Sequence, residues 1–117
     1  MLTKDQIFEA KDLVIEKVEV PEWGGDVFVR GMTGTERDSF ESSVIDIRGS
    51  SQKVNMSNIR AKLVSLSVCD EKGNRIFEDS DIIELGKKSA FALQRIFDVA
   101  QRLSGLSKEE MKALEKN

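Results

Sequence analysis

The first third of the chain alternates apolar and polar positions in the pattern of a β-hairpin. In a strand expected over Leu13–Val20, every second residue toward the end is apolar, and the same alternation resumes at Val27. Between them, Pro21–Gly25 combines a fixed φ with two glycines that adopt positive φ readily, as tight turns require. We predict a hairpin with Trp23 at its turn, and we favour Trp23 as a cap over the local core rather than as an exposed recognition residue.

The rest of the chain places apolar residues at helical spacing, often behind a capping box. Thr3 with Gln6 predicts a short helix over Lys4–Ala10, and Thr33 with Glu36 starts a longer helix that Gly49 ends. Further helices are expected from Ser57 to about Val68, around Ile82–Leu85 before Gly86, and, after an N-cap at Ser89, over Ala90–Leu103. The apolar stripes of the three longer helices are Phe40, Val44 and Ile47; Ile59, Leu63 and Leu66; and Leu93, Ile96, Phe97, Ala100 and Leu103.

Two further segments leave alternatives open. The polar turn over Asp70–Asn74 leads to Ile76 and Phe77, which form either a small strand or a pinned loop. Phe91 falls on the charged face of the Ala90–Leu103 helix, so it either packs under a neighbouring loop, the reading we favour, or is exposed for a partner.

The C-terminal end repeats the capping-box pattern but has few apolar residues behind it. Ser107 and Glu110 precede only Met111 and Leu114 before a highly charged end. We therefore expect one α+β domain over residues 1–106, with an N-terminal β-hairpin packed on a bundle of about four to five α-helices. Residues 107–117 are expected to form a charged, mobile tail or a helix that needs a partner.

Composition narrows the class of protein without identifying a function. The 117 residues, 39% hydrophobic and 33% charged, suit one soluble domain with a heavily solvated surface. The net charge of −3 and the lack of Lys/Arg runs give no sign of nucleic-acid binding, and the apolar stretches are too short to cross a membrane. We therefore expect a cytoplasmic protein. The single Cys69 ends an apolar run and is expected to be a buried small hydrophobe.

The residues offer little for catalysis, so we expect no enzyme, cofactor or metal. The chain has no His and no Tyr, which removes the commonest general base and most nucleophile pairs. The stretch Asp70–Glu84 holds six acids against two bases, but a calcium loop would need Gly where Arg75 stands. Gly86–Ser89 resembles the end of a phosphate-binding loop, yet Asp81 stands where that loop needs its first Gly. An enzyme or ligand module built on the acidic stretch is kept only as a rival hypothesis.

The order of segments adds a family resemblance. It runs through Val18–Gly25, Val27–Arg30 and Thr33–Glu41, and continues through Ile59–Val64, Asp70–Asn74, Phe77–Asp81, Leu85–Ser89 and Val99–Leu106. In this order the segments resemble the tail assembly chaperones of siphovirus-type bacteriophages and prophages, over nearly the whole chain.

The resemblance implies a chaperone that acts in the host bacterial cytoplasm and is absent from the finished virion. Its partner would be the tape-measure protein, a long helical chain with exposed apolar stripes, which many copies of the chaperone would keep soluble. A self-contact that propagates along this partner would give an oligomer or helical array, and subunits of the major tail protein would later displace the coat. The alternative is a small structural virion protein of the tail tube or the head–tail connector.

The family resemblance transfers no residue-level binding site. We therefore base a hypothesis on apolar residues outside the main stripes, which could contact a partner without being needed by the core. These residues are Trp23, Phe28, Phe91, Leu106, Met111 and Leu114.

Overall fold

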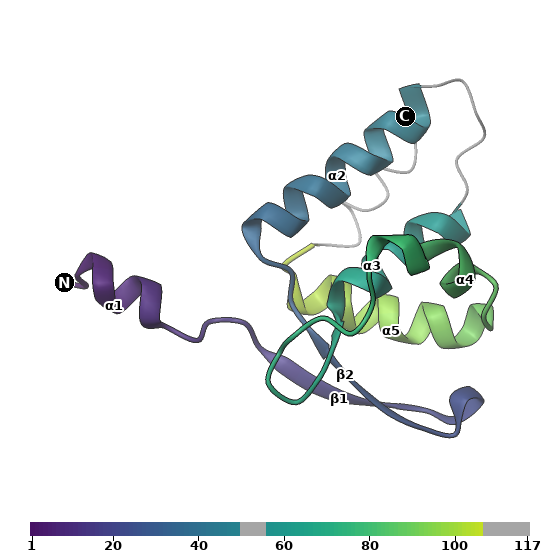
Figure 1. Ribbon diagram of the computed structural model, residues 1–117, viewed down its shortest axis with the longest axis horizontal. Coiled ribbons are helices and arrows are strands. Elements are labelled where there is room, and N and C mark those ends of the chain that lie inside the picture. The colour runs from purple at the N-terminus through teal and green to yellow at the C-terminus, as the bar shows by residue number, and fades with distance from the viewer. Residues whose placement is uncertain (50–55, 107–117) are drawn as a thin grey trace.

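The predicted hairpin is present in the structure, a computed structural model that describes residues 1–49 and 56–106 (Figure 1). Strand β1 (Ile15–Val20) pairs antiparallel with β2 (Gly25–Arg30). The turn between them is a short 3₁₀ helix, η1 (Pro21–Trp23), closed by Gly24 at φ +75°. β1 begins at Ile15, two residues after Leu13, where the alternation of apolar and polar residues predicted the strand to start.

A third strand that the sequence pattern did not predict completes the sheet. Val68 and Cys69 form β3, which pairs antiparallel with β2, so the strand order is β1-β2-β3. The apolar spacing of the preceding helix runs on through Val68 and so predicts a helical Val68, whereas α3 ends at Ser67. After the Asp70–Asn74 turn, Arg75 makes one bridge to Cys69, and Ile76 and Phe77 follow as a loop, the second of the two alternatives.

The helices follow the predicted order. They are α1 (Lys4–Glu9), α2 (Gly34–Gly49), α3 (Met56–Ser67), α4 (Ile82–Gly86) and α5 (Ala90–Leu103), with a 3₁₀ turn, η2 (Asp79–Asp81), before α4. Two of the three predicted capping boxes form, Thr3 with Gln6 and Thr33 with Glu36, and the third, Ser107 with Glu110, lies outside the described residues. The Ser89 hydroxyl accepts a hydrogen bond from Ala92 N–H at 3.3 Å, which caps α5 as expected. None of the described helices is long and apolar enough to span a membrane.

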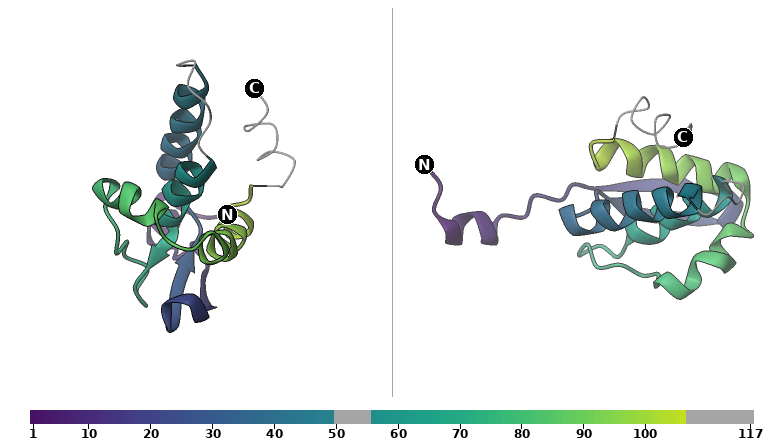
Figure 2. Two further views of the ribbon diagram at one scale, coloured as in Figure 1. Left: turned by 90° about the vertical axis from the view of Figure 1, so that its right-hand side faces the viewer. Right: turned by 90° about the horizontal axis from the view of Figure 1, so that it is seen from above.

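The core lies where α3 and α5 pack against each other and against the sheet (Figures 1 and 2). Cys69 is buried there, as predicted. The predicted α5 stripe is confirmed, with Leu103 partly buried at its end. Phe40 of α2 is also buried in the core, whereas the side chains of Val44 and Ile47 are not among those described. The largest fully buried apolar side chains are Val20, Val29, Phe40, Ile59, Leu63, Val64, Val68 and Ile96.

The N-terminal segment stands apart from this core. In Figures 1 and 2, α1 extends away from the body at the end opposite the hairpin turn. None of its residues is buried, and Phe8 is 78% exposed. An isolated helix of six residues is marginal in water, so its capping box contributes directly to its persistence.

Candidate functional site

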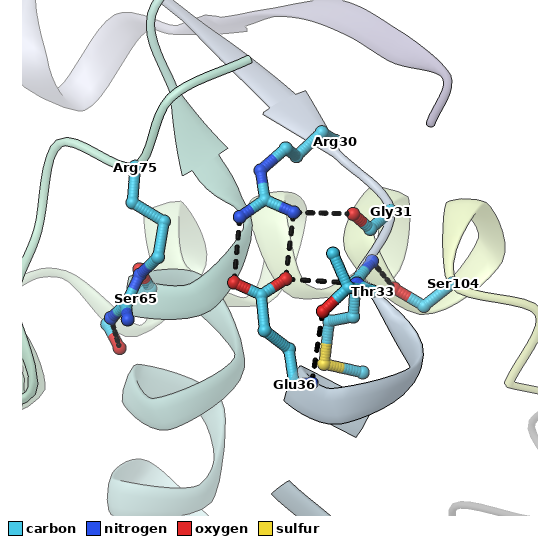
Figure 3. Close-up of polar contacts among 8 residues, drawn as sticks. Arg30, Gly31, Thr33, Glu36, Ser65, Arg75 and Ser104 are labelled. Carbon is cyan, nitrogen blue, oxygen red and sulfur yellow. Dashed lines mark hydrogen bonds and ion pairs between the residues drawn. The ribbon is translucent and has the colours of Figure 1, made fainter. Parts of the chain in front are cut away.

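One end of the hairpin is closed by a buried ion pair (Figure 3). Arg30, at the end of β2, is only 5% exposed, and its Nη1 and Nη2 donate to the two carboxylate oxygens of Glu36 at 2.8 Å each. Arg30 Nη1 also donates to the carbonyl oxygen of Gly31 at 3.0 Å. Such two-bonded arginine–carboxylate pairs are strong and fix orientation.

The same carboxylate also belongs to the capping box of α2, so strand and helix share one group. Glu36 Oε1 accepts the Thr33 backbone N–H at 2.9 Å. Burial alone would raise the pKa of Glu36, but the hydrogen bonds from Arg30 and Thr33 outweigh it, and the net pKa lies below the ordinary 4.5. The Arg30 end of the hairpin is therefore fixed to the start of α2 by bonds within this chain.

The backbone after Arg30 is held equally closely to the C-terminal end of α5. The N–H of Met32 donates to the Ser104 hydroxyl at 3.0 Å (Figure 3). A Cβ atom at Gly31 would lie 2.5 Å from the carbonyl oxygen of Leu103, so only glycine fits there without movement. These contacts explain the packing of hairpin on helix, and they offer no space for a ligand.

The other end of the hairpin carries a surface pocket of about 660 Å³ between η1 and α4. Its apolar wall comes from the hairpin turn, from the loop after β3 and from α4. We call it the Trp23 pocket, and its lining residues are Glu22, Trp23, Ile76, Phe77, Asp81, Glu84, Leu85 and Lys88. Its volume lies within the range of about 300–1,000 Å³ that is usual for binding sites.

Two features of the pocket distinguish it from ordinary packing. Ile76 is 54% exposed although it is a large aliphatic residue, and the indole Nε1 of Trp23 is buried with no hydrogen-bond partner among the described residues. A buried donor left without an acceptor costs stability. The pocket therefore presents partly exposed apolar surface to a ligand.

The rim of the pocket is mainly acidic. Glu22 accepts hydrogen bonds from Arg95 of α5, including one from Nη2 at 3.1 Å, and these bonds lower the pKa of Glu22. Lys87 reaches Glu84 at 3.3 Å on the surface of α4. Exposed pairs of this kind contribute little to folding stability. Glu22, Glu84 and Asp81 give the pocket lining three carboxylates against the single cation Lys88.

The structure separates the three aromatic residues of the binding hypothesis. Trp23 lines the pocket, is partly buried and packs against the core, as the cap interpretation expected. Phe28 lies elsewhere, in the middle of β2 between Lys17 and Cys69 on the neighbouring strands. Phe91 is 80% exposed in the first turn of α5, three residues after Lys88, so the expectation that it packs under a loop is wrong.

The remaining members of that hypothesis lie outside the pocket. Leu106 is 4% exposed and belongs to the core, so our reason for choosing it, an apolar residue outside the main packing, does not hold. Its burial follows the backbone turn at Gly105, whose φ is +74° and which brings Leu106 N–H to the carbonyl oxygen of Gln101 at 3.0 Å. Met111 and Leu114 fall outside the described residues.

Sequence reasoning missed Ile76, Phe77 and Leu85 as pocket residues. Apolar residues at helical or loop positions look alike in a sequence whether they pack inward or line a surface recess. The one available signal was the short acidic stretch around them, which we interpreted only as a solvated face.

The other candidate chemistry has ordinary structural explanations. The Asp70 carboxylate accepts the backbone N–H groups of Lys72 and Asn74 at 2.9 and 3.0 Å, which forms a turn and lowers the pKa of Asp70. Within the described part of the chain, no group of three His, Cys, Asp or Glu residues is placed to hold a metal ion. Burial raises the pKa of the Cys69 thiol, which disfavours the reactive thiolate.

Comparisons with known proteins point to one family. The sequence model of a family described as phage tail assembly chaperone matches residues 3–116. The fold is similar to a solved structure, that of the bacteriophage HK97 tail assembly chaperone, with a TM-score of 0.63 at 20% identity, over 85% of this chain and 94% of that chain. No curated protein matches the sequence.

Proposed function

We propose that this chain, which belongs to the phage tail assembly chaperone family, binds the tape-measure protein through the Trp23 pocket and keeps it soluble during tail assembly. The observation that carries the proposal is the pocket itself. It is a recess with partly exposed apolar walls and a mainly acidic rim.

The size of the pocket suits a few side chains of a longer helix. About 660 Å³ can take the apolar residues of one or two helical turns. The acidic rim favours a segment that carries Lys or Arg beside its apolar residues.

One such contact is weak, and weakness is useful for a chaperone that must be released. Many copies bound along one tape-measure chain would hold it through the sum of small contacts, while each copy stays exchangeable. Tail-tube subunits could then displace the copies one at a time. We place this activity in the host cytoplasm and without any catalytic step.

Co-expression with the tape-measure protein from the same phage or prophage tests the proposal. Ile76→Ser changes an exposed pocket residue at small cost to the fold, and Val14→Ser changes an equally exposed valine outside the pocket. We expect Ile76→Ser to leave most of the tape-measure protein insoluble, and Val14→Ser to keep it at least as soluble as the parent chain does.

Two results would contradict the proposal. One is full solubilisation by a correctly folded Ile76→Ser variant. The other is the presence of this chain in purified virions, detected by mass spectrometry, which would favour a structural tail-tube or connector protein.

A further inference from the structure

The exposed large apolar side chains fall into two groups at opposite ends of the molecule. Among the described residues, seven of the ten such side chains lie within residues 1–15, and residues 1–14 project as the segment that we call the arm. The other three are Ile76, Ile83 and Phe91. Ile76 lines the Trp23 pocket, Ile83 belongs to α4, the helix that forms one wall of the pocket, and Phe91 follows the lining residue Lys88 by three positions. The chain thus carries a protruding apolar segment and a recessed apolar site.

The arm has the properties of a helical ligand. The capping box of Thr3 and Gln6 holds α1 in shape, while Ile7 and Phe8 are 55% and 78% exposed. Ala10 then leaves the helix in an extended conformation, and the residues up to Val14 are exposed as well. Because the capping box favours this short helix before it binds, less conformational entropy is lost than for an uncapped segment.

The geometry directs the arm toward another molecule. The arm joins β1 at Ile15, whereas the pocket lies beyond the other end of that strand, which is about 20 Å long. Figures 1 and 2 show α1 pointing away from the body, on the side opposite η1 and α4. An arm in this orientation points away from its own pocket, which lies behind it.

We propose that the arm of one copy docks through Ile7 and Phe8 into the Trp23 pocket of a second copy, and that the tape-measure protein displaces it. The contact joins two different surfaces, so it is head-to-tail and can extend through further copies. The docking itself is independent of the proposed function, whereas the competition with the tape-measure protein rests on it.

The contact should be weak enough to exchange. A six-residue helix seated in one surface pocket buries well under the roughly 1,200 Å² of a stable interface. Self-association is therefore expected to depend on concentration and to yield to a long ligand that engages many pockets at once. In this arrangement the arm shields the apolar pocket whenever no tape-measure segment is present.

Cross-linking between two variants tests the docking directly. A Glu9→Cys copy, changed beside the docking residues, is mixed with a Lys88→Cys copy, changed on the pocket rim, and treated with a short bifunctional maleimide, since the native Cys69 is buried. We expect a cross-linked dimer from this mixture. Replacing the second variant with Glu71→Cys, an exposed position in the Asp70–Asn74 turn, should give much less product. Equal cross-linking in both mixtures, or none in either, would overturn the docking.

A second pair of variants separates docking from competition. Ile7→Ser/Phe8→Ser removes the arm's apolar side chains, and the control Lys11→Ser/Asp12→Ser changes the same arm without touching them. Sedimentation velocity should show the first variant as a monomer at concentrations where the control and the parent chain self-associate. A first variant that still self-associates would overturn the docking.

Binding of the tape-measure protein supplies the remaining readout. At a total chain concentration ten times the Kd of self-association, arms occupy most pockets of the parent chain. The Ile7→Ser/Phe8→Ser variant leaves its pockets free, so it should bind the tape-measure protein roughly fourfold more tightly than the parent chain does. A monomeric variant with unchanged binding would overturn the competition and leave the docking intact. If Ile76→Ser abolished self-association but still bound the tape-measure protein fully, the proposed function would fail and the docking would stand.

Discussion

The two ends of the hairpin use their polar groups in opposite ways. At the Arg30 end, both Nη atoms of a buried guanidinium bond to Glu36 while its Nε has no partner among the described residues, the same carboxylate caps α2, and the backbone at Gly31 lies close to that of Leu103. At the Trp23 end, the ion pairs are exposed, an indole N–H has no partner, and Ile76 faces solvent. The first end stabilises the fold, and the second retains exposed apolar surface that a partner can use.

The largest expected effect comes from breaking the buried pair. Glu36→Ala removes the partner of a guanidinium that is 5% exposed and also removes half of a capping box, so we expect a loss of about 3 kcal/mol in the free energy of unfolding. Glu41→Ala, on the same helix but in a more exposed pair with Arg37, should cost no more than about 0.5 kcal/mol. Chemical denaturation measures both, and equal losses would show that the Arg30 end is not specially fixed.

A slightly smaller effect is expected at Gly31. Gly31→Ala places a methyl group against the Leu103 carbonyl oxygen, which belongs to the backbone and cannot rotate away, so about 1–3 kcal/mol should be lost. Gly34→Ala, where the added Cβ meets nothing within 4 Å, is the matched control and should be neutral or slightly stabilising. Thermal unfolding of the two variants would contradict the account if Gly31→Ala were the better tolerated.

The next effect is a dependence on pH. The folded-state pKa of Glu36 lies below its ordinary 4.5, so its pairing contributes stability above pH 4.5, and this contribution is lost as the pH falls through the folded-state pKa. The difference in unfolding free energy between the parent chain and Glu36→Gln should therefore shrink between pH 6 and pH 3. A difference that stays constant over that range would show that ionisation of Glu36 does not matter.

The smallest effect on stability is expected at the Trp23 end. Arg95→Gln removes an exposed partner of Glu22, and we expect no resolvable shift in the unfolding midpoint. It should instead make the pocket rim more acidic and raise the salt sensitivity of tape-measure binding. A clear drop in the unfolding midpoint would show that both ends of the hairpin are structural.

Sequence reasoning reached the hairpin and the helices because their signals are local. Alternation in β1, the capping boxes at Thr3 and Thr33, and the stripe of α5 each depend on residues a few positions apart. It missed β3, since a two-residue strand has no period of its own and exists only by pairing with β2. The same limit applied to the ion pair of Arg30, a residue that looks like any surface arginine until α2 folds against it.

The candidate site was only partly predictable for the same reason. Trp23 could be identified because a large aromatic residue at a turn is unusual. The residues opposite it come from a loop and a short helix more than fifty positions later, and only the tertiary fold brings them together. The burial of Leu106 likewise depends on the Gly105 turn and on contacts that no local pattern records.

The most direct measurement is site-specific photo-cross-linking in cells that express both this chain and the tape-measure protein. A photoreactive phenylalanine analogue replaces Ile76 in the pocket or, as the comparison site, Phe28 in the middle of β2. The account predicts a tape-measure adduct from position 76 and little or none from position 28. An adduct from position 28 with none from position 76 would contradict it.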